Sequence, residues 1–366
     1  MTELIHCADG NKRFAQIAIE QGFTYGAQLP NTVYARPEFV DQNWKKPNRA
    51  AYMAALREYQ PRLASVLDWE TDDQLDEVLS WADEAARYVS EAVIIIPKVM
   101  GGIPRLPRTI RGKQVRLGYS VPTSYGGTCL PVWEFAGWPV HLLGGSPNHQ
   151  LNLQAYMDVR SADGNYSQLM ATKYGRFYAA NRQARGKDPQ WPKLNETRDT
   201  SALADVPYIT FRLSCANIQA AWNGCRAYLR YGNEADIDTI KRIANQYKNE
   251  LGFVNKAALR DSVARFTLFV AEYMGAVVGF VNSYRRKDGW NTIYEIAVDK
   301  AHRGEGIGRA LLDAVPRPVR LKCTVDNAAN EFYAAQGMAL VRTEQGKKRQ
   351  LNVWQRQVVD VKQETC

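Results

Sequence analysis

Short apolar runs alternate with amphipathic stretches along the first 230 residues of the chain. This alternation is typical of strands and helices that follow one another in a parallel α/β protein. The clearest helix is predicted over residues 71–89, because its apolar positions recur every three or four residues and acidic residues fill its first turn. Apolar runs predict strands at residues 4–8, 23–28, 63–69, 92–99, 115–121, 140–144, 156–160 and 208–213.

These eight predicted strands favour an α/β fold with an N-terminal (β/α)8-type barrel over an open doubly wound sheet. An open sheet would normally carry a glycine-rich fingerprint after its first strand, where this chain reads CADGNKR. A polar, proline-bearing segment at 182–207 precedes the last predicted strand, and a helix and a short linker follow that strand. We therefore predict a barrel domain over residues 1–230.

The chain from residue 231 to 366 has a different pattern. Three strand-like runs at 266–273, 276–284 and 291–298 predict a meander, and a glycine-rich turn from Arg303 to Gly308 leads into an apolar-sided helix. Glycines lack the Cβ atoms that would keep a ligand away from the backbone, so N–H groups at the start of this helix can converge on an anion. We expect that anion to be a pyrophosphate.

The turn R-x-x-G-x-G at 303–308 resembles the acyl-CoA signature of the GNAT acetyltransferase family. The stretch DNAANEFYAAQGM at 326–338 is similar to that family's N-x-x-A-x-x-F-Y-x-x-x-G-F helix, with Met338 in place of the usual Phe. The resemblance implies a C-terminal GNAT α+β domain over residues 231–366, with acetyl-CoA as its cofactor. The cofactor contacts that it implies are Ala297, Val298, Arg303, Gly304, Gly306, Ile307, Gly308 and Asn327.

Acyl transfer to an amine needs a base for the amine and an acid for the leaving thiolate. Glu295, in the strand before the glycine turn, is the candidate base, unless a neighbouring arginine or lysine neutralises it. By resemblance to the family, Tyr333 is the candidate acid toward the sulfur of CoA.

In a barrel of this kind, working residues lie at the C-terminal ends of the strands. The stretches LDWE (67–70), HLLGGSP (141–147) and DVRSADG (158–164) resemble parts of the tRNA-guanine transglycosylase superfamily, although that family's zinc cluster and D-S-G-G-F-Q motif are missing. The resemblance implies a carboxylate nucleophile, for which Asp163 and Asp158 are the candidates; the alternative is that both cap loops. The candidate substrate-binding residues are Asp68, Gly144, Gly145 and Ser161, and Ser161 also aligns with the nucleophile position.

Charge and cysteine content add to these expectations. The net charge of +9 favours a polyanionic partner such as nucleic acid. The 6 cysteines are scattered, with no pair at zinc spacing, so we expect no metal site. No apolar run approaches the roughly 20 residues that span a bilayer, and the start of the chain does not resemble a signal peptide. We therefore expect a cytoplasmic location and no membrane partner.

Three interpretations of the whole chain follow. The first is an acetyltransferase joined to a transglycosylase-like barrel that together modify a base in nucleic acid, with DNA favoured over tRNA; this pairing resembles a phage-type DNA-modification enzyme. The second is a small-molecule or protein N-acetyltransferase whose barrel only binds the acceptor. The third is an acetyl-CoA sensor, against which Glu295 and Tyr333 argue. The sequence leaves open the acyl acceptor, the choice between DNA and RNA, whether the barrel is catalytic, and the oligomeric state.

Overall fold

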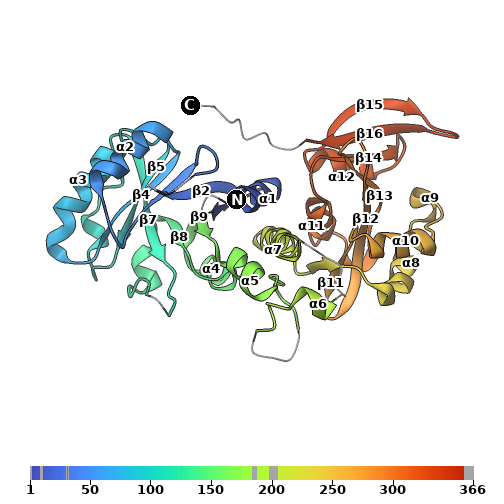
Figure 1. Cartoon of the computed structure of the whole chain (residues 1–366), viewed down its shortest axis with the longest axis horizontal. Coiled ribbons are helices and arrows are strands. Elements are labelled where there is room, and N and C mark those ends of the chain that lie inside the picture. Colours follow the sequence, from blue (N-terminus) through green and yellow to red (C-terminus); the bar gives the residue numbers. More distant parts are fainter. Residues whose placement is uncertain are drawn as a thin grey trace. The chain divides into compact units, whose positions relative to one another are not determined.

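The computed structural model describes residues 2–8, 11–29, 31, 33–124, 126–183, 188–197 and 205–357 (Figure 1). The chain divides into two compact units, one ending at Leu169 and the other spanning Met170–Asp360. This division lies earlier in the chain than the predicted boundary between residues 230 and 231. Neither unit contains, in its described residues, a helix with the length and apolar character that crossing a membrane requires.

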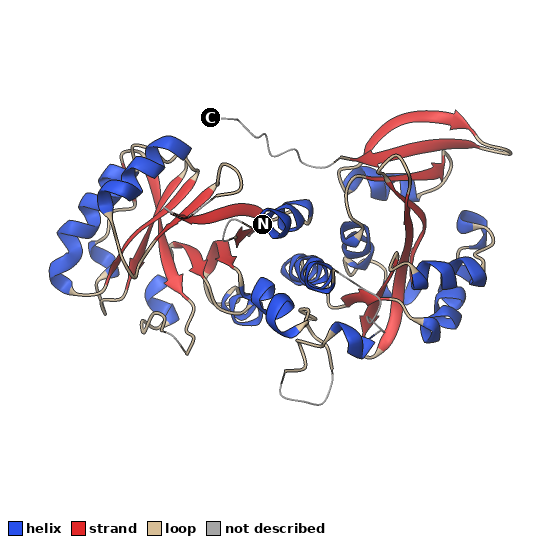
Figure 2. Cartoon of the chain, viewed as in Figure 1, coloured by secondary structure: helices blue, strands red, loops and turns tan. Residues whose placement is uncertain are grey.

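The first unit is a closed barrel of parallel strands, which confirms the predicted fold class (Figure 2). Neighbours along the chain pair in parallel, and the last strand pairs back with the first. A short strand, β6 (Thr109–Ile110), forms a hairpin with one barrel strand. The barrel strands are β1 (Glu3–Cys7), β2 (Thr24–Leu29), β3 (Phe39–Gln42), β4 (Leu63–Trp69), β5 (Ala92–Pro97), β7 (Lys113–Ser120), β8 (Pro139–Leu143) and β9 (Asp158–Gly164).

One strand prediction for the barrel is wrong, and one barrel strand was not predicted. The run 208–213 is not the last barrel strand but the first part of helix α7 (Val206–Trp222), since its apolar character continues through small buried residues for several more turns. A short apolar run cannot be assigned to a strand or a helix by periodicity alone. The barrel instead includes β3, whose four residues are too few to give a strand pattern.

Helices cover the outside of the barrel, and apolar side chains fill its middle. Helix α1 packs against β1 and β2, and α3 packs against β4 and β5. The buried interior cluster consists of Ile5, Phe39, Leu63, Ala92, Ile94 and Ile96. The helices of this unit are α1 (Lys12–Glu20), α2 (Arg49–Tyr59), α3 (Leu75–Ala85) and α4 (Pro147–Leu153), and α5 (Tyr166–Tyr174) spans the division between the units.

The second unit is a twisted sheet in the order β10-β11-β12-β13-β14-β16-β15, with helices on both faces (Figure 1). All pairs are antiparallel except β13 with β14. The strands are β10 (Tyr228–Tyr231), β11 (Leu268–Tyr273), β12 (Ala276–Arg285), β13 (Asn291–Val298), β14 (Val319–Thr324), β15 (Ala339–Gln345) and β16 (Gln350–Arg356). The helices are α6 (Leu194–Thr197), α7, α8 (Ile237–Asn245), α9 (Lys248–Leu251), α10 (Lys256–Ala264), α11 (Ile307–Ala314) and α12 (Ala329–Ala335).

Helix α7 is an integral part of the second unit. Its side chains share one apolar cluster with those of α11 and α12. The buried Asn217 of α7 binds both backbone groups of Leu229 in β10, donating to the carbonyl at 2.9 Å and accepting from the N–H at 2.6 Å. The predicted linker at Tyr231 therefore lies inside a buried strand that α7 holds in place.

Candidate functional site

The glycine-rich turn before α11 presents free backbone N–H groups. Gly304 and Gly306 have φ values of 83° and 75°, a region that favours glycine, and no atom lies within 4 Å of a Cβ built on Gly304. In the described part of the chain, the N–H groups of Gly304, Gly306 and Ile307 donate to no protein acceptor. With the N-terminus of α11 behind them, these groups have the arrangement that an anion-binding turn requires.

Strands β13 and β14 separate beside this turn. They pair only from Asn291 to Ile293, so the rest of β13 has no partner on that side among the described residues. The N–H of Asp299 donates to Val278 of β12 at 2.8 Å, and the strand alternation therefore directs the N–H groups of Ile296 and Val298 into the gap. Ala297, predicted as a cofactor contact, has its backbone toward β12 and its side chain in the cluster under α8 and α10.

Glu295 is presented on β13 by a β-bulge. The β12–β13 pairing shifts between Asn282 and Ser283, which leaves Tyr294 as an extra residue. The carboxylate accepts a hydrogen bond from Nδ2 of Asn282 at 2.7 Å, and no arginine or lysine of the described chain forms an ion pair with it. Burial raises the pKa of Glu295, and the Asn282 hydrogen bond opposes that rise. A carboxyl group with a raised pKa suits a base that works near neutrality.

Tyr333 lies in α12 and packs in the same apolar cluster as α11. Its ring contacts those of Phe332 and Trp354, at centroid distances of 5.4 and 6.2 Å. Burial raises its pKa strongly, with a smaller contribution from Cys323 on β14, so the hydroxyl keeps its proton at neutral pH. Its hydroxyl makes no hydrogen bond to another described residue.

Two further predicted residues have clear structural positions. The guanidinium of Arg303 lies over the ring of Tyr247, 4.7 Å from its centre, and the Tyr247 hydroxyl donates to the carbonyl of Val298 at 2.6 Å. Asn327 caps α12 by accepting from the N–H of Ala329 at 2.9 Å. Arg303 is thus held beside the gap. The side-chain oxygen of Asn327 already accepts a hydrogen bond from within the protein.

Asp163 lies at the C-terminal end of β9, the mouth of the barrel. Its carboxylate accepts from Sγ of Cys7 at 3.2 Å and from the N–H of Gly144 at 3.3 Å. Nε2 of His141 is 3.3 Å from Oδ1, close enough for an ion pair but without hydrogen-bond alignment. Gly145 must be glycine, because a Cβ there would come within 2.5 Å of Val121.

Two more carboxylates end neighbouring strands at this mouth. Asp68 of β4 pairs with Nζ of Lys98 at 2.8 Å. Asp41 of β3 accepts from the hydroxyl of Ser65 and has no cationic partner among the described residues. Burial, together with the charges of Asp163 and Asp68, raises the pKa of Asp41 to about 7. At neutral pH this mouth therefore holds a carboxyl group that can both give and take a proton.

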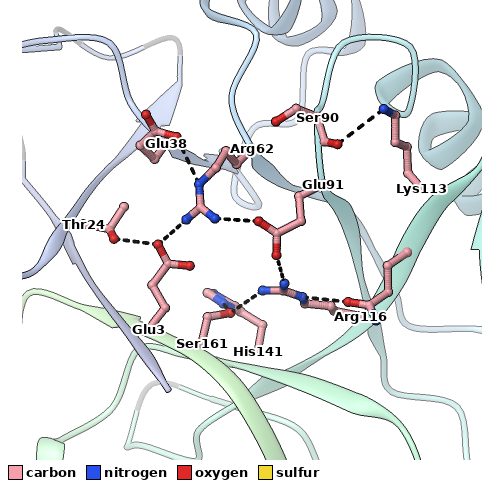
Figure 3. A network of polar contacts seen from close by, with 11 residues as sticks. Glu3, Thr24, Glu38, Arg62, Ser90, Glu91, Lys113, Arg116, His141 and Ser161 are labelled. Carbon is pink, nitrogen blue, oxygen red and sulfur yellow. Dashed lines mark hydrogen bonds and ion pairs between the residues drawn. The ribbon is translucent and has the colours of Figure 1, made fainter. Parts of the chain in front are cut away.

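A chain of polar contacts continues from Asp163 through His141 into the barrel. Figure 3 shows the part of this chain from His141 to Arg62. Oγ of Ser161 is 2.8 Å from Nδ1 of His141 and accepts from Arg116 at 3.3 Å. Arg116 pairs with Glu91, and Glu91 pairs with Arg62 at the N-terminal end of the barrel. Ser161 is therefore an interior residue and not the mouth residue that the sequence predicted.

Asp158 is the other correction in the barrel. It begins β9, opposite Pro139 at the start of β8, so it lies at the N-terminal end of the barrel. Its carboxylate is half exposed and pairs with Arg160 at 2.8 Å. Five residues of strand, about 16 Å, separate it from Asp163, and the two cannot act at one site.

Two family models match the chain. The model described as "Family of unknown function (DUF6610)" matches residues 18–223, more than half of the chain. The chain belongs to this family. A second model, "Acetyltransferase (GNAT) domain", matches residues 264–337. The second unit of this DUF6610 protein is a GNAT acetyltransferase domain, as its sequence predicts, and domains of this kind use acetyl-CoA.

The DUF6610 match crosses the division between the units and includes α7. The resemblance of the barrel to transglycosylases gains no support from either match.

Solved structures of acetyltransferases are similar to part of the chain. Ard1 from Thermoplasma volcanium shares 23% identity over 37% of this chain and 99% of its own, with a TM-score of 0.33. The ribosomal-protein-S18-alanine N-acetyltransferase from Escherichia coli shares 16% over 38% and 99%, with a TM-score of 0.34. Rv2747 from Mycobacterium tuberculosis, in complex with CoA, shares 24% over 32% and 75%, with a TM-score of 0.28. No curated protein matches the chain.

The residues of the glycine turn and of β13 fit acetyl-CoA in their chemistry. The open backbone at Gly304 and the free N–H groups of the turn suit a pyrophosphate. The gap between β13 and β14 exposes backbone groups to which a pantetheine arm can bond. Arg303, Gly304, Gly306, Ile307 and Gly308 would hold the pyrophosphate end, and Val298 the arm.

Sequence reasoning missed Asp41 and Asn282. Asp41 directly follows two apolar residues, but the run was too short to be identified as a strand. Asn282 is a polar residue within the apolar run AVVGFVNSY, and that exception was the available signal.

Proposed function

We propose that this DUF6610 protein transfers an acetyl group from acetyl-CoA to an amine, with Glu295 as base and Tyr333 as acid. The observation that supports it best is the bulge that sets the Glu295 carboxylate on β13, the strand that opens from β14 beside the glycine turn. When bound, acetyl-CoA supplies the acetyl group as a thioester and leaves as a thiol.

The residues have separate tasks in this proposal. An Oε of Glu295 takes a proton from the incoming ammonium, directly or through a water, and leaves the nitrogen lone pair free. The N–H groups of Ile296 and Val298 donate toward the thioester oxygen, whose negative charge grows as the N–C bond forms. As the C–S bond breaks, the hydroxyl of Tyr333 gives its proton to the departing sulfur, and the second proton that the nitrogen must lose passes through solvent to the tyrosinate.

Thiol release tests this function. The full chain is incubated with acetyl-CoA and a panel of amines, and free CoA is measured. Activity should be lost in Glu295→Gln, whereas Glu344→Gln on β15 serves as a carboxylate control away from the gap. Equal turnover by the parent and Glu295→Gln would contradict the assigned base.

We infer further that the acceptor amine belongs to a base in nucleic acid, with DNA favoured over tRNA. The net charge of +9 supports a polyanionic partner. The carboxylates of Asp41, Asp68 and Asp163 support it as well, because they can accept hydrogen bonds from the donor edge of a purine. The alternative is a small-molecule or protein amine, with a barrel that only binds the acceptor.

A glycosyl-transfer step at the barrel mouth is the second candidate function. In this step an oxygen of Asp163 bonds to the anomeric carbon while the carbon–base bond breaks, and the leaving base takes the proton of Asp41. The hydrogen bonds that the Asp163 carboxylate accepts from Cys7 and Gly144 hold it in place, and the raised pKa of Asp41 provides a proton for the leaving base, so both observations support this division of roles.

Nucleic-acid binding and nucleoside analysis test both inferences about the barrel. The affinity of the full chain for DNA and for RNA is measured against salt, since phosphate contacts give a steep slope. Nucleosides from cells that express the parent, Asp68→Asn or Asp163→Asn are analysed by mass spectrometry, with Asp158→Asn as the matched control at the other barrel end. A protein that binds neither nucleic acid at low salt and acetylates a small amine equally well in all variants would leave only the alternative.

A further inference from the structure

Asn282 of β12 is a buried polar residue with one half of its side chain unused. It is 5% exposed, and its Nδ2 group donates to Glu295 at 2.7 Å. Its carbonyl oxygen Oδ1 is also buried, and in the described chain it accepts no hydrogen bond. Buried carbonyl groups are nearly always paired, so an unpaired one beside a base needs an explanation.

The orientation of this side chain follows from its partner. An ionised carboxylate only accepts hydrogen bonds, so Asn282 must turn its amino group, and not its oxygen, toward Glu295. The oxygen is then directed away from Glu295 but stays next to it. Its neighbours Phe280 and Val281 are apolar, and the hydroxyl of the buried Ser283 donates to the carbonyl of Thr267 at 3.2 Å, so the unpaired oxygen sets Asn282 apart from them.

The backbone brings the two side chains together at one place. The bulge at Tyr294 falls between the pair Asn282–Glu295 and the next pair along the strands. A bulge re-aims the side chains that follow it, and bulges are common beside active sites. Asn282 and Glu295 are thus set side by side on β12 and β13, and the other edge of β13 borders the gap.

We propose that Oδ1 of Asn282 accepts a hydrogen bond from the acceptor amine, while Nδ2 holds Glu295 oriented as the base. This inference rests on the proposed acetyl transfer and adds Asn282 as a residue that contacts the acceptor, for which the acceptor must keep two N–H groups. Once Glu295 has taken one proton from a primary ammonium, two N–H groups remain: one for Asn282 and one for the neighbouring carboxyl group. A secondary amine has only one left, and a hydroxyl none.

Ethylamine is the probe for this contact, because it offers a primary amine and little else. In the CoA-loaded full chain, the side-chain amide signals of Asn282 are identified by their loss in Asn282→Leu. Ethylamine should shift these signals in a saturable way, and diethylamine should shift them less. No shift with ethylamine would overturn the contact, whether or not the protein proves to be an acetyltransferase.

Kinetic and binding measurements separate the two contacts of Asn282, one with the amine and one with Glu295. Asn282→Leu should weaken the binding of ethylamine about three- to tenfold, the effect of one neutral hydrogen bond. This appears as a higher KM in the parent background and as a higher Kd, measured by calorimetry on the CoA-loaded protein, in the inactive Glu295→Gln background. Asn282→Leu should also move the acidic limb of the pH–rate profile to higher pH, because the ionised carboxylate loses a donor. Asn282→Ser keeps a short polar group, so its affinity for ethylamine and its acidic limb should lie between those of the parent and those of Asn282→Leu.

An unchanged Kd of ethylamine for Asn282→Leu in the Glu295→Gln background would overturn the contact with the amine and leave Asn282 as a positioning residue only. Equal turnover of ethylamine and diethylamine would overturn the primary-amine class. If the parent acetylates no amine, the proposed function fails instead, and the amide signals still decide the contact.

Discussion

The two units of this protein expose chemistry in opposite ways. In the acetyltransferase domain, β13 and β14 separate, and backbone N–H groups are left free beside a glycine turn. In the barrel, every strand is paired on both sides, so the strand backbone is occupied and carboxylate side chains are the candidate groups at the mouth. One site is built mainly from backbone geometry, and the other from buried charges.

This difference determines which substitutions each site can accept without losing stability or function. Buried charges need compensating partners, and the barrel supplies them through the chain from Arg62 to Asp163. Free backbone groups need no such chain, but they need the correct φ values at Gly304 and Gly306. Changes of charge should therefore affect the barrel most through stability, and the acetyltransferase domain most through binding and rate.

The largest expected effect concerns the boundary between the units. A fragment of residues 231–366 lacks α7, whose Leu213, Ala216 and Ala220 pack in the cluster with Leu311 of α11. We expect this fragment to stay unfolded, because that apolar surface would be exposed to water. A fragment of residues 170–366 should fold. Circular dichroism and the dispersion of amide signals compare the two, and a folded 231–366 fragment would restore the boundary predicted from the sequence.

The next effect is on chemistry. Tyr333→Phe keeps the ring in its apolar cluster and removes the proton donor, so kcat should fall by about 10²- to 10⁴-fold. The affinity for acetyl-CoA, measured by calorimetry, should change little. A variant that keeps the parent kcat would show that the sulfur is protonated by another group.

A smaller effect is the dependence of the barrel's stability on pH. The pKa of Asp41 is raised from 3.8 to about 7, so the folded barrel retains a proton that the unfolded chain loses as pH rises through this window. Stability therefore falls between about pH 4 and pH 7. Asp41→Asn removes this loss and should stabilise the barrel at pH 8 by up to about 4 kcal/mol, or several degrees in Tm.

Thermal unfolding of the full chain at pH 5 and pH 8 measures this effect, and the barrel transition is the one that acetyl-CoA does not raise. Asp158→Asn, a half-exposed carboxylate paired with Arg160, is the control and should change little at either pH. Stabilisation of the same size at both pH values would show that Asp41 is not the titrating group.

The sequence predicts the acetyltransferase half well because its signals are local. The turn and α12 lie within about 35 residues of each other, and each motif sets its own backbone conformation. The barrel site depends on longer-range features. Asp163 meets Cys7 from the other end of the unit, and only closure of the barrel makes them neighbours.

Some predictions were wrong because the ends of a strand were misplaced, although the strand itself was predicted. Placing the last true barrel strand at 156–160 instead of Asp158–Gly164 put Asp158 and Asp163 at the same end of the barrel, because the position of a residue along a strand decides which mouth it faces. Glu295 was predicted, but its partner Asn282 was not, since the register of β12 against β13 includes a bulge that the sequence does not mark.

The smallest effect concerns the glycine turn of the acetyltransferase domain and is tested by two substitutions that differ mainly in charge. Gly304 has a positive φ and open space around it, and Asn and Asp tolerate this backbone region better than other residues with side chains. Gly304→Asn and Gly304→Asp therefore share the same strain and nearly the same shape. The carboxylate of the Asp variant repels a pyrophosphate at the turn, so acetyl-CoA should bind roughly tenfold more weakly to it than to the Asn variant, about 1–2 kcal/mol.

Calorimetry at two salt concentrations checks this difference. Because the turn is open to solvent, the difference in acetyl-CoA affinity between Gly304→Asn and Gly304→Asp should become smaller as the ionic strength rises from about 0.05 to about 0.5 M. Loss of binding in both variants would indicate a backbone effect and not a charge effect. Equal affinities of Gly304→Asp, Gly304→Asn and the parent would place the pyrophosphate away from this turn.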